Sequence, residues 1–184
     1  MIVRTELTDE ALSTLGRLAA EAATAALNDT STLAVATTAT VEGYVDGVLR
    51  RLIDSSPYQT SAFLKMLVAE MEDRIFQSWS ERFRWLRGGF GLMLEGSSEK
   101  KRLDVLIELR NACVHGNGSL TERQCRDVAA LLALERQLGN VLGVTVVRRR
   151  LIFSSSTARR AVTVARDFVI AFDDELRRAQ VGLI

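Results

Sequence analysis

Apolar side chains recur along most of this chain three or four residues apart. The clearest segment holds Leu33, Val41, Tyr44, Val45, Val48, Leu49 and Leu52. Residues at this spacing share one face of an α-helix, so each such segment predicts a helix with one buried side. Helices are predicted at residues 8–27, 31–53, 58–76, 79–87, 99–115, 120–138 and 157–179.

Local signals mark where several of these helices begin or end. Thr8 is expected to cap the first helix, and Pro57 to occupy the first position of the third. Ser78 and Glu81 have the spacing of a capping box. Gly116 is expected to end the helix before it in the left-handed conformation that glycine favours.

Two short strands are predicted at residues 143–147 and 151–153, on either side of a basic turn. A two-stranded ribbon is only marginally stable alone, so it is expected to pack on the helices. The pattern as a whole predicts a mainly α fold with a small β-hairpin before the C-terminal helix. Residues 1–184 are expected to form a single domain.

The composition is that of a globular protein with a hydrophobic core, since 47% of the residues are apolar and only 1 is proline. The formal net charge of +1 identifies no partner. Cys113 and Cys125 form no paired motif and are interpreted as reduced thiols in or near the core. No signal peptide and no membrane span is recognised, so a cytoplasmic location is expected.

The stretch 108–118 contains the only histidine of the chain, His115, together with Arg110 and Asn111. On a regular helix, Asn111 and His115 lie on one face, whereas Arg110 and His115 are roughly 140° apart around the axis. A long arginine side chain can bridge that angle, and a helix that ends at Gly116 leaves His115 free to reorient. The spacing therefore permits all three side chains to meet.

The wider string, Leu-Arg-Asn-Ala-Cys-Val-His-Gly-Asn-Gly-Ser-Leu-Thr, resembles the R-N-x-x-x-H segment of HEPN-domain ribonucleases. It looks most like the bacterial defence and toxin-type members, in which His-Gly follows. Residues 79–91 and 103–121 look like the middle of those domains, and residues 168–176 resemble their C-terminal helix. The N-terminal half matches no signature of the family.

This resemblance implies an antiparallel helical bundle that forms a homodimer, with the motifs of both subunits in one cleft. It implies that Arg110 and His115 are the catalytic pair and that Asn111 supports them. It also implies that the substrate is RNA, and that the protein is a toxin or defence effector. An inhibitory antitoxin or another defence-system protein is then a further expected partner.

RNA cleavage through the ribose 2′-hydroxyl requires a base, an acid and positive charge beside the phosphorus. Arg110 is assigned to charge stabilisation and His115 to proton transfer. The expected activity is that of a metal-independent endoribonuclease that leaves a 2′,3′-cyclic phosphate. Neither a metal nor another cofactor is expected, because one histidine and two scattered cysteines give poor ligand spacing.

Other basic and aromatic residues are weaker candidates for RNA contact. The turn Arg148-Arg149-Arg150 is either such a contact or a solvated turn. Residues 79–87 offer two tryptophans and three arginines: Trp79 and Trp85, and Arg82, Arg84 and Arg87. Either the tryptophans stack on bases while the arginines bind phosphates, or the tryptophans belong to the core and the arginines to the surface. Residues 99–102 are interpreted as a solvated helix start.

Two alternatives remain for the motif itself. In these alternatives, His115 caps backbone carbonyls and Arg110 pairs with Glu108 or Glu99. The corresponding functions are a non-catalytic HEPN-like module that binds RNA, nucleotide or protein, and a structural dimer whose motif builds only the interface.

Overall fold

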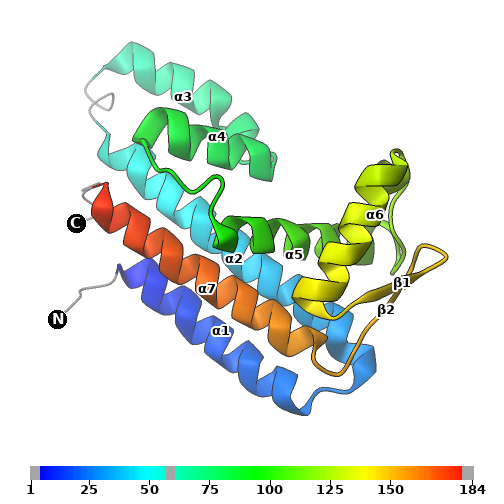
Figure 1. Cartoon of the computed structure of the whole chain (residues 1–184). Coiled ribbons are helices and arrows are strands. Elements are labelled where there is room, and N and C mark those ends of the chain that lie inside the picture. Colours follow the sequence, from blue (N-terminus) through cyan, green and yellow to red (C-terminus); the bar gives the residue numbers. More distant parts are fainter. Residues whose placement is uncertain (1–4, 57–60, 180–184) are drawn as a thin grey trace.

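A computed structural model describes residues 5–56 and 61–179 of the chain. Within them the fold is mainly α, with one two-stranded antiparallel hairpin before the C-terminal helix (Figure 1), which confirms the predicted fold class. The elements are α1 (Glu6–Thr24), α2 (Thr30–Ser55), α3 (Ala62–Ile75), α4 (Trp79–Phe90), α5 (Ser98–His115), α6 (Val128–Gln137), β1 (Thr145–Val147), β2 (Arg150–Ile152) and α7 (Thr157–Arg178).

Helices α1, α2 and α7 lie side by side and form the body of the molecule (Figure 1). Helix α5 packs on α2 and α7. The largest fully buried side chains of α7 are Phe168 and Phe172, whose ring centroids are 5.7 Å apart. Tyr44 of α2 meets the Phe172 ring edge-on at 5.5 Å. Aromatic contacts therefore join the central helices over and above their aliphatic packing.

A buried polar cluster links the same three helices. The Thr8 hydroxyl donates to Asp173 Oδ1 at 2.7 Å and lies 3.3 Å from the Tyr44 hydroxyl. Arg177 Nη2 lies 2.9 Å from the other Asp173 oxygen. Burial raises the pKa of the Tyr44 hydroxyl above its usual range, so this group keeps its proton. The predicted cap is therefore wrong by one turn: Thr5 caps α1, and Thr8 points into the core.

The other predicted helix starts are partly confirmed. Ser78 Oγ accepts from the Glu81 N–H at 3.2 Å, as the capping-box spacing predicts. The helix predicted from residue 120 begins only at Val128, where the Asp127 carboxylate accepts from the Ala130 N–H. A 3₁₀ turn occupies the residues before it, Arg123–Cys125. The expectation for Pro57 lies outside the described residues.

The interpretation of residues 99–102 as a solvated helix start is wrong for Lys100. Its side chain is only 12% exposed and its Nζ lies 2.5 Å from Asp104 Oδ1. The same ammonium group lies 4.3 Å from the centroid of the Phe83 ring. In this way the alkyl stem of a lysine covers apolar surface and its ammonium group contacts an aromatic ring, while its charge remains paired.

Helix α3 differs from α2, α5 and α7 because its apolar side is only partly covered, by contacts of Val68, Met71 and Ile75 with the core. Ile75 is the buried residue of this helix, whereas the exposed apolar side chains are Phe63, Leu64, Met66 and Leu67. The apolar spacing predicted the helix correctly but not the burial of its face. None of the described helices has the length and apolar character needed to cross a membrane.

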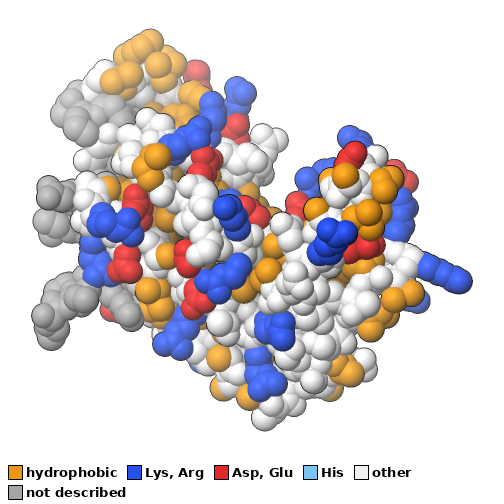
Figure 2. Space-filling model, in the orientation of Figure 1, with side chains coloured by type: hydrophobic (Ala, Val, Ile, Leu, Met, Phe, Trp, Pro, Cys, Tyr) orange, Lys and Arg blue, Asp and Glu red, His pale blue; other side chains and the backbone are white. Residues whose placement is uncertain are grey.

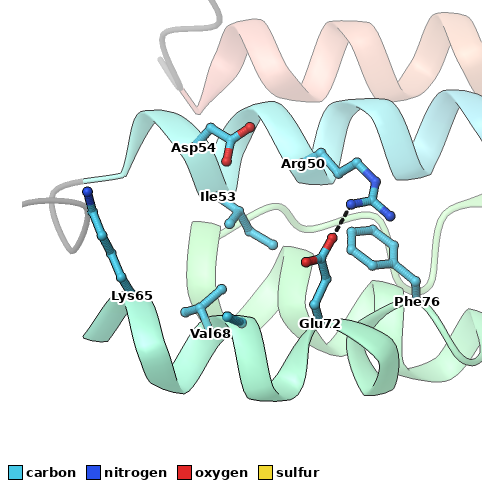
Figure 3. Close-up of a pocket in the computed structure, with 8 residues that line it drawn as sticks. Arg50, Ile53, Asp54, Lys65, Val68, Glu72 and Phe76 are labelled. Atoms are coloured by element: carbon cyan, nitrogen blue, oxygen red, sulfur yellow. Dashed lines mark hydrogen bonds and ion pairs between the residues drawn. The ribbon is translucent and has the colours of Figure 1, made fainter. Parts of the chain in front are cut away.

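A small pocket of about 260 Å³ separates α3 from α2 (Figure 3). An ion pair between Arg50 and Glu72 spans it, and the Arg50 guanidinium lies 4.1 Å from the centroid of the Phe76 ring. Exposed ion pairs of this kind contribute little, about 0–1 kcal/mol. Helix α3 is therefore held mainly by its C-terminal end.

This attachment predicts local opening of α3. Backbone amides of residues 62–74 are expected to exchange with solvent faster than those of α2 and α7, because few apolar contacts must break to expose them. Hydrogen exchange followed by mass spectrometry measures this directly. Protection of α3 equal to that of α7 at low protein concentration would contradict the weak attachment.

Candidate active site

The last turn of α5 carries the three candidate residues, and the core fixes how it is presented. The α5 residues that are buried are Leu103, Val105, Leu106, Ile107, Leu109 and Ala112. Since Leu109 and Ala112 face the interior, the two positions between them face outward. Arg110 and Asn111 are accordingly only partly buried, and His115 at the helix end is exposed.

The structure brings Arg110, Asn111 and His115 together. Arg110 Nη1 lies 3.0 Å from His115 Nε2 and 3.4 Å from Asn111 Oδ1. The arginine side chain thus spans the angle between its own position and that of His115. A guanidinium can only donate, so Nε2 is the acceptor, and a neutral His115 ring carries its proton on Nδ1.

No carboxylate pairs with Arg110 among the described residues. Glu108 accepts instead from Arg123 Nη2 at 2.8 Å and from Gln124 Nε2 at 2.5 Å. Glu99 lies 3.4 Å from Arg102. The alternative in which Arg110 pairs with Glu108 or Glu99 is therefore wrong. The Arg110 guanidinium retains its positive charge for an anionic ligand.

Gly116 follows His115, but it does not adopt the predicted left-handed conformation. Its φ is −102°, and the left-handed residues are Asn117 and Gly118, at φ 49° and 78°. The N–H groups of Gly116 and Gly118 both donate to the Ala112 carbonyl at 3.1 Å. A Cβ at Gly116 would lie 1.8 Å from the Ser119 carbonyl oxygen. Glycine is needed here because two stretches of backbone approach closely.

The β-hairpin holds the connection that follows the motif. The Leu120 N–H donates to the Arg149 carbonyl at 2.7 Å, and the Leu151 N–H donates to the Gly118 carbonyl at 2.9 Å. Ser119 and Arg150 form an antiparallel bridge. Residues 118–120 thus extend the hairpin as a short third strand. This pairing fixes the chain close to the C-terminal end of α5.

The hairpin turn itself bears the predicted basic run. Arg148 and Arg149 have positive φ values of 49° and 70°, as a tight hairpin turn requires. The side chains of Arg148, Arg149 and Arg150 are exposed and do not line the cleft described below. Figure 2 shows basic side chains at the edge of the molecule where the hairpin projects. RNA contact by these arginines stays a prediction.

The motif lies in an open cleft of about 590 Å³, between the start of α4 and the end of α5. The space-filling view is hollowed between the α3–α4 pair and α6 (Figure 2). Besides the motif, the cleft is lined by residues at and before the start of α4, by residues in and before the 3₁₀ turn, and by three others: Gln77, Ser78, Trp79, Ser80 and Arg82; Thr121 and Arg123; Glu42, Ile107 and Glu108. The volume is within the range of small-molecule and cofactor sites.

Arg82 is not available for phosphate, contrary to one of the two expectations for its segment. Its side chain is 6% exposed, with Nε 2.5 Å from Asp46 Oδ1 and Nη2 3.0 Å from Glu42 Oε1. A buried guanidinium needs such partners, since an unpaired charge there costs several kcal/mol, roughly. Arg84 pairs with Glu81, outside the cleft. The segment therefore contributes structure more than free charge.

A buried side chain that supports the Thr121–Arg123 edge of the cleft was not predicted from the sequence. Gln124 is buried, and its Oε1 accepts from both the N–H and the hydroxyl of Thr121 while its Nε2 donates to the Glu108 carbonyl. This side chain ties the 3₁₀ turn to α5, one residue from Leu109. The Thr121–Gln124 spacing resembles a capping motif and was the only local signal.

Cys113 lies within the motif, and its side chain is partly buried. Burial raises the pKa of Cys113 to about 11, so the thiol keeps its proton at neutral pH. Cys113 and Cys125 are both free. In residues 5–56 and 61–179, no three His, Cys, Asp or Glu side chains gather as a metal ion would require.

No family model, curated protein or solved structure matches this chain. The side chains in the cleft nonetheless define a coherent chemistry. The lining carboxylates Glu42 and Glu108 are paired with Arg82 and Arg123. The remaining groups are the Arg110 guanidinium, the imidazole in contact with it, an aromatic ring, and hydroxyl and amide groups. Such a set suits an anionic ligand that also has a planar apolar part.

Replacement of Gly116 by alanine tests how tightly the motif is held. The added Cβ must displace the Ser119 carbonyl, so we expect a loss of stability of about 1–3 kcal/mol. Thermal unfolding measures the change. Gly88→Ala is the matched control, because Gly88 has open space around it within α4 and alanine favours the helix. Equal melting temperatures for the two variants would contradict the close approach.

Proposed function

We propose that this protein is a metal-independent endoribonuclease with Arg110 and His115 as its catalytic pair. The observation that carries the proposal is the contact of 3.0 Å between Arg110 Nη1 and His115 Nε2, in an open cleft and without a carboxylate on Arg110 among the described residues. A cation and a proton-transfer group are thus presented together. The R-N-x-x-x-H resemblance to HEPN-domain ribonucleases supports the same assignment.

The proposed reaction begins when a phosphate of the RNA binds the Arg110 guanidinium and replaces His115 Nε2 as its hydrogen-bond acceptor. That exchange releases His115 Nε2, which is then free to accept the proton of the adjacent 2′-hydroxyl. The 2′-oxygen bonds to phosphorus, and the bond to the 5′-oxygen breaks once that oxygen receives a proton. Arg110 stabilises the charge that develops on the non-bridging oxygens. Asn111 Oδ1 helps to hold the guanidinium in place.

One His115 cannot both take the first proton and give the second at the same moment. A second subunit would supply a second imidazole, which is the arrangement that the resemblance implies. The exposed position of His115 at the end of α5 is compatible with such a shared cleft. We therefore propose a homodimer with a composite active site.

The biological setting follows from the resemblance alone. The proposed role is that of a cytoplasmic toxin or defence effector, held in check by an inhibitory partner. A non-catalytic module that binds RNA, nucleotide or protein is the alternative, and it differs in giving binding without turnover.

Cleavage in the absence of divalent metal tests the catalytic assignment. Wild-type protein in excess EDTA is expected to cut single-stranded RNA to 2′,3′-cyclic phosphate and 5′-hydroxyl ends, and to leave the 2′-deoxy counterpart intact. Arg110→Ala and His115→Ala are each expected to lower the rate about 100-fold or more. Arg84→Ala removes a charge outside the cleft and should cut normally.

The outcome separates the candidate functions. Wild-type rates in both motif variants would refute the assignment of the catalytic pair. Binding of RNA without any cleavage by the wild type would favour the non-catalytic module.

Mixing subunits tests whether the active site is composite. Wild-type and His115→Ala proteins are allowed to exchange subunits at equal concentrations. If both imidazoles are needed, only wild-type homodimers cut. One quarter of all dimers are then active, so activity falls to about one quarter of that of an equal total amount of protein that is entirely wild type. Independent sites would retain about one half. Exchange with Arg84→Ala is the control and should retain full activity.

A further inference from the structure

The cleft contains an aromatic side chain to which the proposed reaction gives no role. Trp79 is the first residue of α4 and lines the cleft opposite Arg110, Asn111 and His115. It is partly buried, in contrast to the fully enclosed aromatic rings of α7. Part of the indole therefore remains accessible within the same space as the catalytic pair.

The Trp79 ring is held in place by two neighbours on α4. It stacks on Phe83, with ring centroids 6.0 Å apart and planes inclined by 19°. Phe83 in turn meets the buried Phe168 edge-on at 6.1 Å. The Arg82 guanidinium, clamped by its two carboxylates, lies 5.5 Å from the Trp79 centroid. A ring supported in this way loses little conformational freedom when a ligand stacks on it.

Trp85 provides a contrast on the same helix. Its Nε1 is enclosed without a hydrogen-bond partner among the described residues, and Trp85 does not line the cleft. Trp79 Nε1 is not among the enclosed polar atoms. Both tryptophans are partly buried and pack against the core, so their position relative to the cleft is what distinguishes Trp79.

The neighbours of Trp79 suit a nucleobase. The same cleft is lined by the hydroxyls of Ser78 and Ser80, by the amide of Gln77 and by the Arg110 guanidinium, which has no carboxylate partner among the described residues. Single-stranded RNA is commonly recognised through bases that stack on aromatic side chains while arginines hold the phosphates. The cleft thus offers both parts of a nucleotide a contact.

We propose that Trp79 is a stacking platform for one base of single-stranded RNA, next to the phosphate held by Arg110. This inference rests on the proposed function and adds a base-binding subsite to it. Stacking on a tryptophan tolerates any base, so the platform favours unpaired RNA over a duplex and imposes little sequence preference by itself.

The chain has only two tryptophans, so fluorescence can follow the platform directly. The probe is a short single-stranded RNA with 2′-O-methyl riboses, which lacks the attacking hydroxyl and is not cut. In Trp85→Phe protein, Trp79 is the sole tryptophan and its emission should be quenched as the probe is added. In Trp79→Phe protein, the remaining Trp85 emission should not change.

Affinity for the same probe separates stacking from simple packing. Trp79→Leu keeps an apolar side chain over Phe83 but removes the aromatic face, and it should weaken binding about 5- to 150-fold. Trp79→Phe should retain most of the affinity, and Trp85→Phe should retain all of it. Circular dichroism and melting temperature establish that each variant is folded. A duplex form of the probe should bind more weakly than the single strand.

The two proposals fail in distinguishable ways. His115→Ala protein should bind the probe and show the quenching even though it does not cut RNA. Unquenched Trp79 emission at saturating probe, or equal affinity of Trp79→Leu and wild type, would overturn the platform while leaving the catalytic assignment standing. Quenching together with normal cleavage by Arg110→Ala and His115→Ala would overturn the catalytic assignment instead.

Discussion

The packing of α5 on α2 and α7 is the interaction on which the functional end of the molecule depends. Leu109 and Ala112 are fully buried, and this burial leaves only one direction for the side chains between them. The hydrophobic contacts of the core therefore aim Arg110 and Asn111 into the cleft. Backbone bonds to the hairpin then hold the chain beyond His115, so the site is supported from both sides.

Charge in the cleft is distributed by long-range pairing. Arg82, Arg110 and Arg123 all line it, yet Arg82 is neutralised by α2 carboxylates and Arg123 by Glu108. Of these three arginines, only Arg110 lacks an acidic partner among the described residues, and it contacts an imidazole instead. The cleft therefore contains one arginine without a carboxylate partner among the described residues, in contact with the imidazole of His115.

Periodicity and local chemistry predicted most of the helices and the hairpin, and helix geometry permitted the meeting of the three motif side chains. They could not predict features that depend on distant parts of the chain. Arg82 and Asp46 are 36 positions apart, and no local pattern connects them. The need for glycine at position 116 arises from a backbone approach visible only in three dimensions. Likewise, only the three-dimensional structure shows that Trp79 lines the cleft and Trp85 does not.

The polar cluster of Thr8, Tyr44 and Asp173 has a consequence for how the helices are aligned. Apolar faces tolerate sliding, because one leucine can replace another at the same contact. A slip of one helical turn, about 5.4 Å, would instead leave the Asp173 carboxylate buried without its hydroxyl donor. The cluster thus specifies a single axial register for α1, α2 and α7. Since α5 packs on two of these helices, that register also sets the height at which the cleft is assembled.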